Sequence, residues 1–218
     1  MYKRQPLSLI AGGTGLVGSH VIKALSKKSG AQIILARSFD SEIPQNADLQ
    51  IINFDSLSSN KVKLKNDIDH VYLCLGKRLS THELGYMQHS ARESFKLIDF
   101  EYPLSIAKLA YDSGARSIAL VSAVGAQEGS FNYYFHIKGK LENEIKKIGY
   151  ENICFARPGH LLGARKDFRG YEIPILESGL RIAAPFMQGP LKNFRQIEAR
   201  KVAAVSYTHL RAHETPIN

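Results

Sequence analysis

The sequence predicts an α/β protein built on a doubly wound parallel β-sheet with helices on both faces. Short apolar runs rich in β-branched residues alternate with segments of helical periodicity along most of the chain, a pattern typical of parallel strands joined by right-handed helical crossovers. The first apolar run also ends in a glycine-rich loop that leads directly into a helical segment. Both observations favour the open, doubly wound type of sheet.

Six segments are predicted to be buried strands. Each is predominantly apolar, as expected for parallel strands that are covered on both faces. Several of them close on a glycine, which marks the point where the chain leaves the sheet. The segments are 7–13, 31–38, 49–54, 70–76, 117–125 and 152–163.

Three helices are predicted between these strands. The first begins at Gly18, places apolar residues at helical spacing and ends with Gly30 as its C-cap. The second covers about 89–113 and ends at Gly114, and the third begins within SFNYYFHIKGK, residues 130–140. Each has an apolar face that would pack against the sheet.

The composition is that of an ordinary globular domain. The chain has 218 residues, of which 44% are hydrophobic, and this length suits one well-filled core. No apolar run approaches the roughly 20 residues that a membrane span needs, and the first residues do not form a signal peptide. The net charge of +9 is spread along the chain, so it favours anionic ligands without indicating a nucleic-acid partner.

The cysteines and histidines indicate neither disulfides nor a metal site. Cys74 and Cys154 both lie inside apolar stretches, which favours buried, reduced thiols over a disulfide or a nucleophile. The histidines show no paired ligand spacing with cysteines or carboxylates, so we expect no metal site. Reduced thiols suit a cytoplasmic protein, and we expect that localisation.

Both ends of the chain resemble translated sequencing adapter. Residues 1–5 and 205–218, the latter including YTHLRAHET, correspond to one reading frame of each strand of a transposon end, and we leave them out of the fold prediction. Residues 6–204 are then predicted to form a single domain. Its segment 164–204 loses the strand–helix alternation and carries three prolines, so we expect a small, truncated substrate-side region there.

The glycine loop predicts a phosphate site. Gly12, Gly15 and Gly18 are spaced G-x-x-G-x-x-G between the first strand and the first helix. Glycines allow the backbone to approach a pyrophosphate, and a helix N-terminus offers unpaired N–H groups and a positive dipole end. Glycines also make simple tight turns, but the strand–loop–helix context favours dinucleotide binding.

The residues after the second strand favour NADP(H) over NAD(H). An acidic residue at this position would bind the ribose hydroxyls and repel a 2′-phosphate, but the sequence has Arg37 and Ser38. A guanidinium provides a planar cationic fork that suits phosphate. The alternative is a solvated arginine at the end of a strand.

One tyrosine and one lysine have the spacing of a proton-transfer site. Tyr134 and Lys138 are four residues apart and would share a helical face, whereas Tyr133 would point elsewhere and serve packing. A phenol is a poor acid–base group at neutral pH, and a neighbouring ammonium would lower its pKa. Ser122 ends the preceding strand, and its hydroxyl could orient a substrate carbonyl.

The motifs GGTGLVG, ARS, CLG, VSAVGA, YFHIK and ARPGHLLG together resemble the short-chain dehydrogenase/reductase superfamily. They are most similar to its atypical branch of Tat-interacting-protein-like NAD(P)H-binding oxidoreductases. The resemblance covers residues 7–204 and implies a Rossmann-like fold. It implies a catalytic triad of Ser122, Tyr134 and Lys138. It implies cofactor binding by Gly12, Thr14, Gly15, Leu16, Val17, Gly18, Arg37, Ser38, Leu75, Gly76, Tyr134, Lys138, Arg157, Pro158 and Gly159.

The chain departs from this pattern on the adenine side. Asn53 occupies the position of the acidic residue of the family, and Asp55 follows two residues later, which leaves the adenine contacts open. Even so, the resemblance implies an NADP-dependent oxidoreductase that acts on a small carbonyl or alcohol. The alternatives are an NADPH-binding regulatory or redox-sensing module that acts through protein partners, and a nucleotide-sugar epimerase or dehydratase.

Overall fold

The computed structural model describes residues 5–28, 30–59, 64, 67–159, 161–162 and 197–212. In this part of the chain, six parallel strands form one sheet in the order β3-β2-β1-β4-β5-β6. The predicted doubly wound, Rossmann-like α/β fold is confirmed. The strands are β1 (Leu7–Ala11), β2 (Ala31–Ala36), β3 (Ala47–Ile51), β4 (His70–Leu73), β5 (Ser117–Val121) and β6 (Asn152–Ala156).

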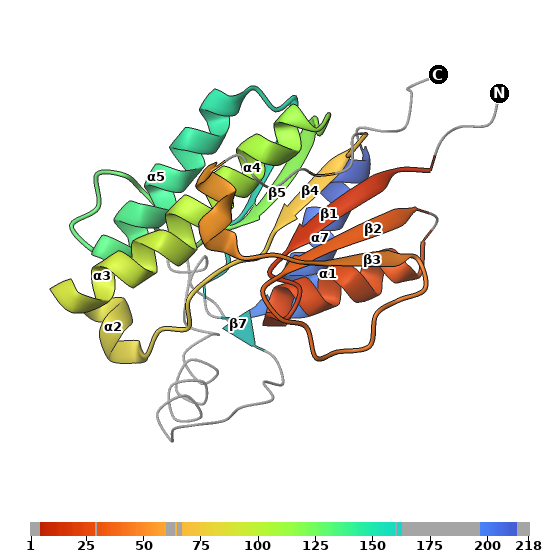
Figure 1. Ribbon diagram of the computed structural model, residues 1–218. Helices are drawn as coiled ribbons and strands as arrows, with labels where there is room; N and C mark the ends of the chain where they lie inside the picture. Colours follow the sequence, from red (N-terminus) through yellow and green to blue (C-terminus); the bar gives the residue numbers. More distant parts are fainter. Residues whose placement is uncertain are drawn as a thin grey trace.

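Helices cover both faces of this sheet (Figure 1). One face carries α1 (Leu16–Ser26) and α7 (Ala199–Ala212), which also contact each other. The other face carries α4 (Tyr102–Asp112), α5 (Tyr133–Ile148) and the short 3-10 helix η1 (Phe54–Ser59). Successive residues of the central strands, such as Leu9 and Ile10 of β1, therefore enter two separate cores, because side chains alternate between the faces of a strand.

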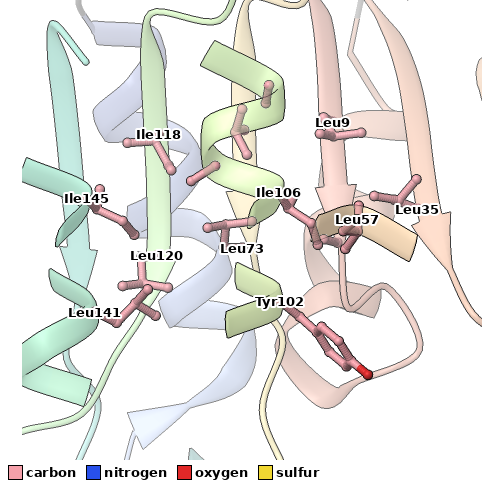
Figure 2. Packing of buried hydrophobic residues seen from close by; sticks show 14 of the residues in the cluster. Leu9, Leu35, Leu57, Leu73, Tyr102, Ile106, Ile118, Leu120, Leu141 and Ile145 are labelled. Atoms are coloured by element: carbon pink, nitrogen blue, oxygen red, sulfur yellow. The ribbon is translucent and has the colours of Figure 1, made fainter. Parts of the chain in front are cut away.

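The larger core lies between the sheet and the layer of α4, α5 and η1. Figure 2 shows Leu9 of β1, Leu73 of β4 and Ile106 of α4 in this core, while Leu141 of α5 lies beside Leu120. All five side chains are at most 1% exposed. The second core, between the sheet and the α1–α7 layer, includes Ile10, Val21, Ile34, Tyr72 and Val202.

The long helix predicted over about 89–113 forms from His89 to Asp112, with a π-helical turn in its middle. Helix α3 (His89–Lys96) passes into a π-helical turn, η2 (Leu97–Glu101), before α4 begins. Pro103 lies near the start of α4. A proline has no N–H to donate to the carbonyl four residues earlier, here that of Asp99, so a regular α-helix cannot continue through this point.

Several predicted boundaries are wrong by a few residues. Most of the predicted strands ran past the carboxyl end of the sheet into the loops that follow, whereas β4, β5 and β6 each stop after four or five residues. Helix α1 begins at Leu16 and has Lys27 as its C-cap, not Gly30. Gly30 instead adopts a φ of 140°, just before β2. Helix α2 (Thr81–Gly85) was not predicted, although Ser80 and Glu83 form a capping box at its start.

The C-terminal prediction is described only in part. A small parallel sheet pairs β7 (Leu161–Leu162) with β8 (Ile197–Glu198), and α7 follows it. The rest of the predicted substrate-side segment 164–204, up to residue 196, lies outside the described residues. Helix α7 extends into the stretch that resembles adapter, and Ser206 and Leu210 of that stretch are buried.

Candidate functional site

Loops at the carboxyl ends of the strands carry most of the predicted site residues. The glycine loop follows β1, Leu75 and Gly76 follow β4, and Ser122 follows β5. β1 and β4 are neighbours, although the chain forms β2 and β3 between them. This reversal of strand order is where doubly wound sheets bind their ligands.

The glycine loop packs too tightly for side chains. Gly12 has a φ of 84°, and a Cβ on it would lie 2.6 Å from the backbone of Cys74 at the end of β4. A Cβ on Gly18 would lie 2.2 Å from the carbonyl oxygen of Gly12. The Gly15 N–H donates to that same oxygen at 3.0 Å. Backbone alone therefore fills the space between β1, β4 and α1.

This loop fits the pyrophosphate of a dinucleotide. Gly15 is the N-cap of α1, no side chain caps the helix, and its first turn has no acidic residue. The first N–H groups of α1 are thus available to an anion. Thr14 is exposed, while the side chain of Val17 is buried in the core beneath α1, so Val17 could contact a cofactor only through its backbone. Leu16 packs against the edge of the same core.

A side-chain cluster beyond the carboxyl end of β2 joins Arg37 to α4. The guanidinium of Arg37 lies 6.0 Å from the ring centroid of Phe54, and Phe54 packs edge-on against Tyr102 with 5.5 Å between ring centroids. The Tyr102 hydroxyl donates to the carboxylate of Asp55. Burial and this hydrogen bond raise the pKa of Tyr102 to about 12. Sequence reasoning missed Phe54 and Tyr102.

The adenine-side residue Asn53 has a local structural role. Its Oδ1 accepts a hydrogen bond from the Asp55 N–H at 3.0 Å, which fixes the turn that begins η1. Asn53, Asp55 and the neighbouring residues Arg37 and Ser38 are all exposed. These side chains are therefore accessible to a ligand at the end of β2 and β3.

Ser122 is buried with its hydroxyl oxygen unsatisfied. Ser122 is 3% exposed. Its backbone N–H donates to the Ala156 carbonyl at 2.8 Å, and this bond ties the end of β5 to β6. The Oγ atom has no hydrogen-bond partner among the described residues. Buried hydroxyls are nearly always satisfied in folded proteins, so this atom is a good candidate for contact with a bound ligand.

Helix α5 begins in a way that fixes Tyr134. Asn132 is its N-cap, and the Asn132 Oδ1 accepts from the Tyr134 N–H at 2.9 Å. The Asn132 Nδ2 donates to the carbonyls of Leu84 and Gly85 at 2.8 and 3.2 Å, so the start of α5 is held against the end of α2. The Tyr134 ring packs on Phe95 with 5.7 Å between ring centroids.

Tyr133 makes packing contacts, and it shares Phe95 with Tyr134. Its ring is 6.2 Å from that of Phe95, and the Arg92 guanidinium lies 4.8 Å from its centroid. Tyr134 and Lys138 both lie in α5, as the spacing argument requires, and the catalytic role of Tyr134 stays a prediction.

Lys138 binds an aspartate that the sequence analysis missed. Its Nζ lies 2.8 Å from Oδ1 of Asp99, and the two side chains are only 5% and 2% exposed. The Asp99 Oδ2 accepts a hydrogen bond from the Lys77 N–H at 2.7 Å. Asp99 is an acidic residue in the apolar run LIDF, and an acid on an apolar helical stretch is the signal that could have revealed it.

The pKa of Tyr134 is raised, not lowered. Burial is the largest cause; the positive charge of Lys138 acts in the opposite direction, and the negative charge of Asp99 adds to the rise. Burial alone would lower the pKa of Lys138, but Asp99 and Tyr134 outweigh it, and the pKa of Lys138 lies above its usual value. The effect of Lys138 that the sequence predicted is therefore present but outweighed by burial and by Asp99.

Arg157 is committed to another partner. Its Nε donates to Glu142 Oε1 at 2.9 Å, and its Nη2 donates to Glu142 Oε2. Glu142 is one helical turn after Lys138 and is 2% exposed. The Pro158 carbonyl accepts from the Val124 N–H at 3.0 Å, and Gly159 is exposed. This segment can therefore border a cofactor mainly through its backbone.

Two further observations concern the whole described part of the chain. No helix in it is long and apolar enough to cross a membrane. The same residues contain no group of three His, Cys, Asp or Glu side chains placed to hold a metal ion.

Comparison with known proteins identifies relatives of the chain. Residues 8–171 match the sequence profile of the NAD dependent epimerase/dehydratase family. A Candida albicans protein named "Protein FMP52, mitochondrial" is 30% identical over 201 residues, which cover 90% of this chain and 85% of that protein. A Kluyveromyces lactis protein of the same name is 30% identical over 168 residues, which cover 75% of this chain and 71% of that protein.

Solved structures share the fold at low sequence identity. The human epimerase family protein SDR39U1 (isoform2) with NADPH superposes with a TM-score of 0.65 at 16% identity, covering 96% of this chain and 71% of that one. The 3-oxoacyl-[acyl-carrier protein] reductase from Brucella melitensis in complex with NAD gives a TM-score of 0.69 at 15% identity, covering 95% and 91%. At these identities the similarity concerns the fold alone.

The expected cytoplasmic localisation is wrong on these findings. The curated relatives carry a mitochondrial location in their names. The expectation relied on reduced cysteines, and a free, buried thiol such as that of Cys154 does not distinguish one reducing compartment from another.

Proposed function

The chain belongs to the NAD dependent epimerase/dehydratase family, and from this premise we propose that it is an NADPH-dependent oxidoreductase that reduces a small carbonyl compound. The observation that supports this most strongly is the interaction of Tyr134 with Lys138, and the unsatisfied hydroxyl of Ser122 adds to it. Tyr134 lies within electrostatic reach of Lys138, and the buried Ser122 hydroxyl oxygen is unsatisfied.

In the proposed reaction, Tyr134 acts as the general acid. Its phenol O–H donates a proton to the carbonyl oxygen of the substrate, and the Ser122 hydroxyl donates a hydrogen bond to the same oxygen. Reduced nicotinamide, when bound, would supply the hydride for the carbonyl carbon, and the product would be the alcohol. The phenol form that this step needs is also the form of an ordinary tyrosine at neutral pH, and the raised pKa of Tyr134 favours the same form.

The preference for NADPH is supported by the end of β2. Arg37 is exposed there and lies beside the Phe54 ring, so its planar guanidinium is accessible to a ribose 2′-phosphate. Ser38, the next residue, is also exposed.

Cofactor titration tests this part of the proposal. Binding of NADPH and NADH is followed by nicotinamide fluorescence in the unmodified chain and in Arg37→Ala. We expect the substitution to weaken NADPH binding about 10-fold or more, as for loss of a charge-assisted hydrogen bond, and to leave NADH binding nearly unchanged. Equal losses for both cofactors would contradict the assignment of Arg37.

Turnover tests the role of Tyr134. A panel of aldehydes and ketones is incubated with NADPH, and its oxidation is followed for the unmodified chain, Tyr134→Phe and the matched control Tyr133→Phe. We expect Tyr134→Phe to lose at least 100-fold in rate, in line with general acid catalysis, while Tyr133→Phe retains turnover. Equal activity of the two variants would exclude Tyr134 as the acid.

The same experiments separate this proposal from its alternatives. A regulatory or redox-sensing module would bind NADPH and turn over nothing in the panel. An epimerase or dehydratase, as the family description allows, would act on its substrate without net consumption of NADPH.

The proposal also extends to domain organisation and location. Residues 6–204 would form the single NADP-binding domain, with 164–204 supplying the substrate side of the site. The mitochondrial location in the names of the relatives would apply to this chain as well, and subcellular fractionation with an antibody against the chain tests it.

A further inference from the structure

We propose that Asp99 is a positioning residue of the catalytic site: it holds Lys138 in a buried ion pair and thereby keeps Tyr134 as a protonated phenol. The site would then be set for carbonyl reduction rather than for alcohol oxidation. This inference rests on the proposed function and adds a residue that neither the family resemblance nor the sequence motifs assigned.

The ion pair is rigidly built. Asp99 lies in the π-helical turn η2 and is 1% exposed. One carboxylate oxygen, Oδ1, contacts the Lys138 Nζ at 2.8 Å, and the other, Oδ2, accepts from the Lys77 N–H at 2.7 Å. The carboxylate thus joins α5 to the loop after β4, with both oxygens occupied.

The π turn explains why the carboxylate can reach this position. Pro103 interrupts the regular helical hydrogen bonding at Asp99, and a π turn rotates the residues before it relative to a continuous α-helix.

The charge of Asp99 changes what Lys138 can do to Tyr134. A lone buried ammonium one helical turn away would favour the phenolate. With Asp99 at 2.8 Å from that ammonium, the pair is neutral overall and its field at the phenol oxygen is much weaker.

Few other charges act on this phenol. Among the described residues, Lys138 and Asp99 are the charged groups that shift the pKa of Tyr134, and burial is the largest cause of the shift. Helix α3 presents the uncharged Phe95 ring to it. Glu142, on the next turn of α5, acts on Lys138 but is itself paired with Arg157.

The direction of the reaction follows from the protonation state. Carbonyl reduction needs the phenol, and alcohol oxidation needs the phenolate as base. Asp99 favours the phenol, so reduction would proceed up to alkaline pH and oxidation would be slow at neutral pH. Removing the negative charge of Asp99 lowers the pKa of Tyr134, and each unit of lowering changes the phenolate fraction at neutral pH about tenfold.

The test measures the titration of Tyr134 directly, in the protein without cofactor. NMR of isotope-labelled tyrosine Cζ atoms reports each phenol, and the Tyr134 signal is assigned by its absence in Tyr134→Phe. We expect Asp99→Asn to move the Tyr134 midpoint to lower pH, and the matched control Glu142→Gln, which also removes a buried carboxylate, to move it less. An unchanged or higher midpoint in Asp99→Asn would overturn the proposal.

A second pair of variants provides the test if Asp99→Asn does not fold, because that substitution leaves a buried ammonium unpaired. Lys138→Gln is compared with the double variant Lys138→Gln/Asp99→Asn, in which no buried charge is left alone. The double variant should titrate Tyr134 at lower pH than Lys138→Gln, and identical midpoints would overturn the proposal.

The result is independent of turnover. If Asp99→Asn lowers the Tyr134 midpoint but no carbonyl is reduced by any variant, the proposed function fails while the effect of Asp99 on Tyr134 stands. If carbonyls are reduced but the midpoint does not move, the function stands and the role of Asp99 is refuted.

Discussion

Replacing Gly18 by alanine places a methyl group 2.2 Å from the carbonyl oxygen of Gly12, 2.8 Å from its carbonyl carbon and 3.0 Å from the Gly13 Cα. All three neighbours are backbone atoms, so no flexible side chain can turn away. Normal carbon contacts lie at about 3.5–4.0 Å, so α1 and the glycine loop must separate by about 1 Å.

Two effects on stability oppose each other in Gly18→Ala. Overpacking of a tight contact costs about 1–3 kcal/mol, while alanine inside a helix is favoured over glycine by about 1 kcal/mol. The net loss in the free energy of unfolding is therefore about 0–2 kcal/mol, and the variant should still fold.

The effect on cofactor binding should be larger than the effect on stability. A shift of about 1 Å removes at least one N–H of the α1 terminus from hydrogen-bonding range of a phosphate, and such a bond to a charged group contributes about 1.5–3 kcal/mol. The Kd for NADPH should rise roughly 10- to 100-fold.

Fluorescence titration with NADPH measures this change, and thermal unfolding confirms that the variant is folded. The matched control is Gly85→Ala at the end of α2, where an added Cβ meets nothing within 4 Å, and NADPH binding should remain unchanged there. If folded Gly18→Ala binds NADPH within twofold of the unmodified chain, the loop does not hold the phosphates as we reason.

Three further predictions concern stability and reactivity. Ile106→Ala removes a side chain that is 0% exposed in the larger core and should cost about 2–5 kcal/mol in chemical denaturation; a loss below 1 kcal/mol would contradict the packing of α4. Asn132→Ala removes the N-cap of α5 and should cost about 1–2 kcal/mol, and an unchanged midpoint of unfolding would refute its capping role. Burial raises the pKa of Cys74 to about 12, so a thiol reagent at pH 8 should label it only after unfolding; rapid labelling of the native protein would show that the thiol is accessible.

The local parts of the fold and site could be predicted from sequence. The glycine loop, the apolar strands and the Tyr134–Lys138 spacing are patterns within a few residues of each other, and each is governed by short-range rules. Strand boundaries were less accurate, because a glycine such as Gly76 or Gly125 follows the sheet at a distance that apolarity alone does not fix.

The non-local parts could not be predicted. The contact between Asp99 and Lys138 joins residues on different helices, and its geometry depends on a π turn that Pro103 produces only in the context of α4. The pairing of Arg157 with Glu142 likewise depends on where α5 packs beside the end of β6. A sequence shows the charges of such residues but not which of them meet.

The raised pKa of Tyr134 illustrates the same limit. Spacing shows that Lys138 is near and predicts the sign of its effect, which is present in the structure. The degree of burial and the second charge, that of Asp99, outweigh this effect, and both are properties of the assembled core.

NADPH oxidation in the presence of a carbonyl panel, compared between Tyr134→Phe and Tyr133→Phe, tests the proposed enzyme directly. Each variant removes a phenol hydroxyl from one of two adjacent residues, and the charges of Lys138 and Asp99 act on Tyr134. We predict that Tyr134→Phe binds NADPH but loses turnover while Tyr133→Phe retains it. Turnover by Tyr134→Phe at the rate of the unmodified chain would contradict the proposed mechanism.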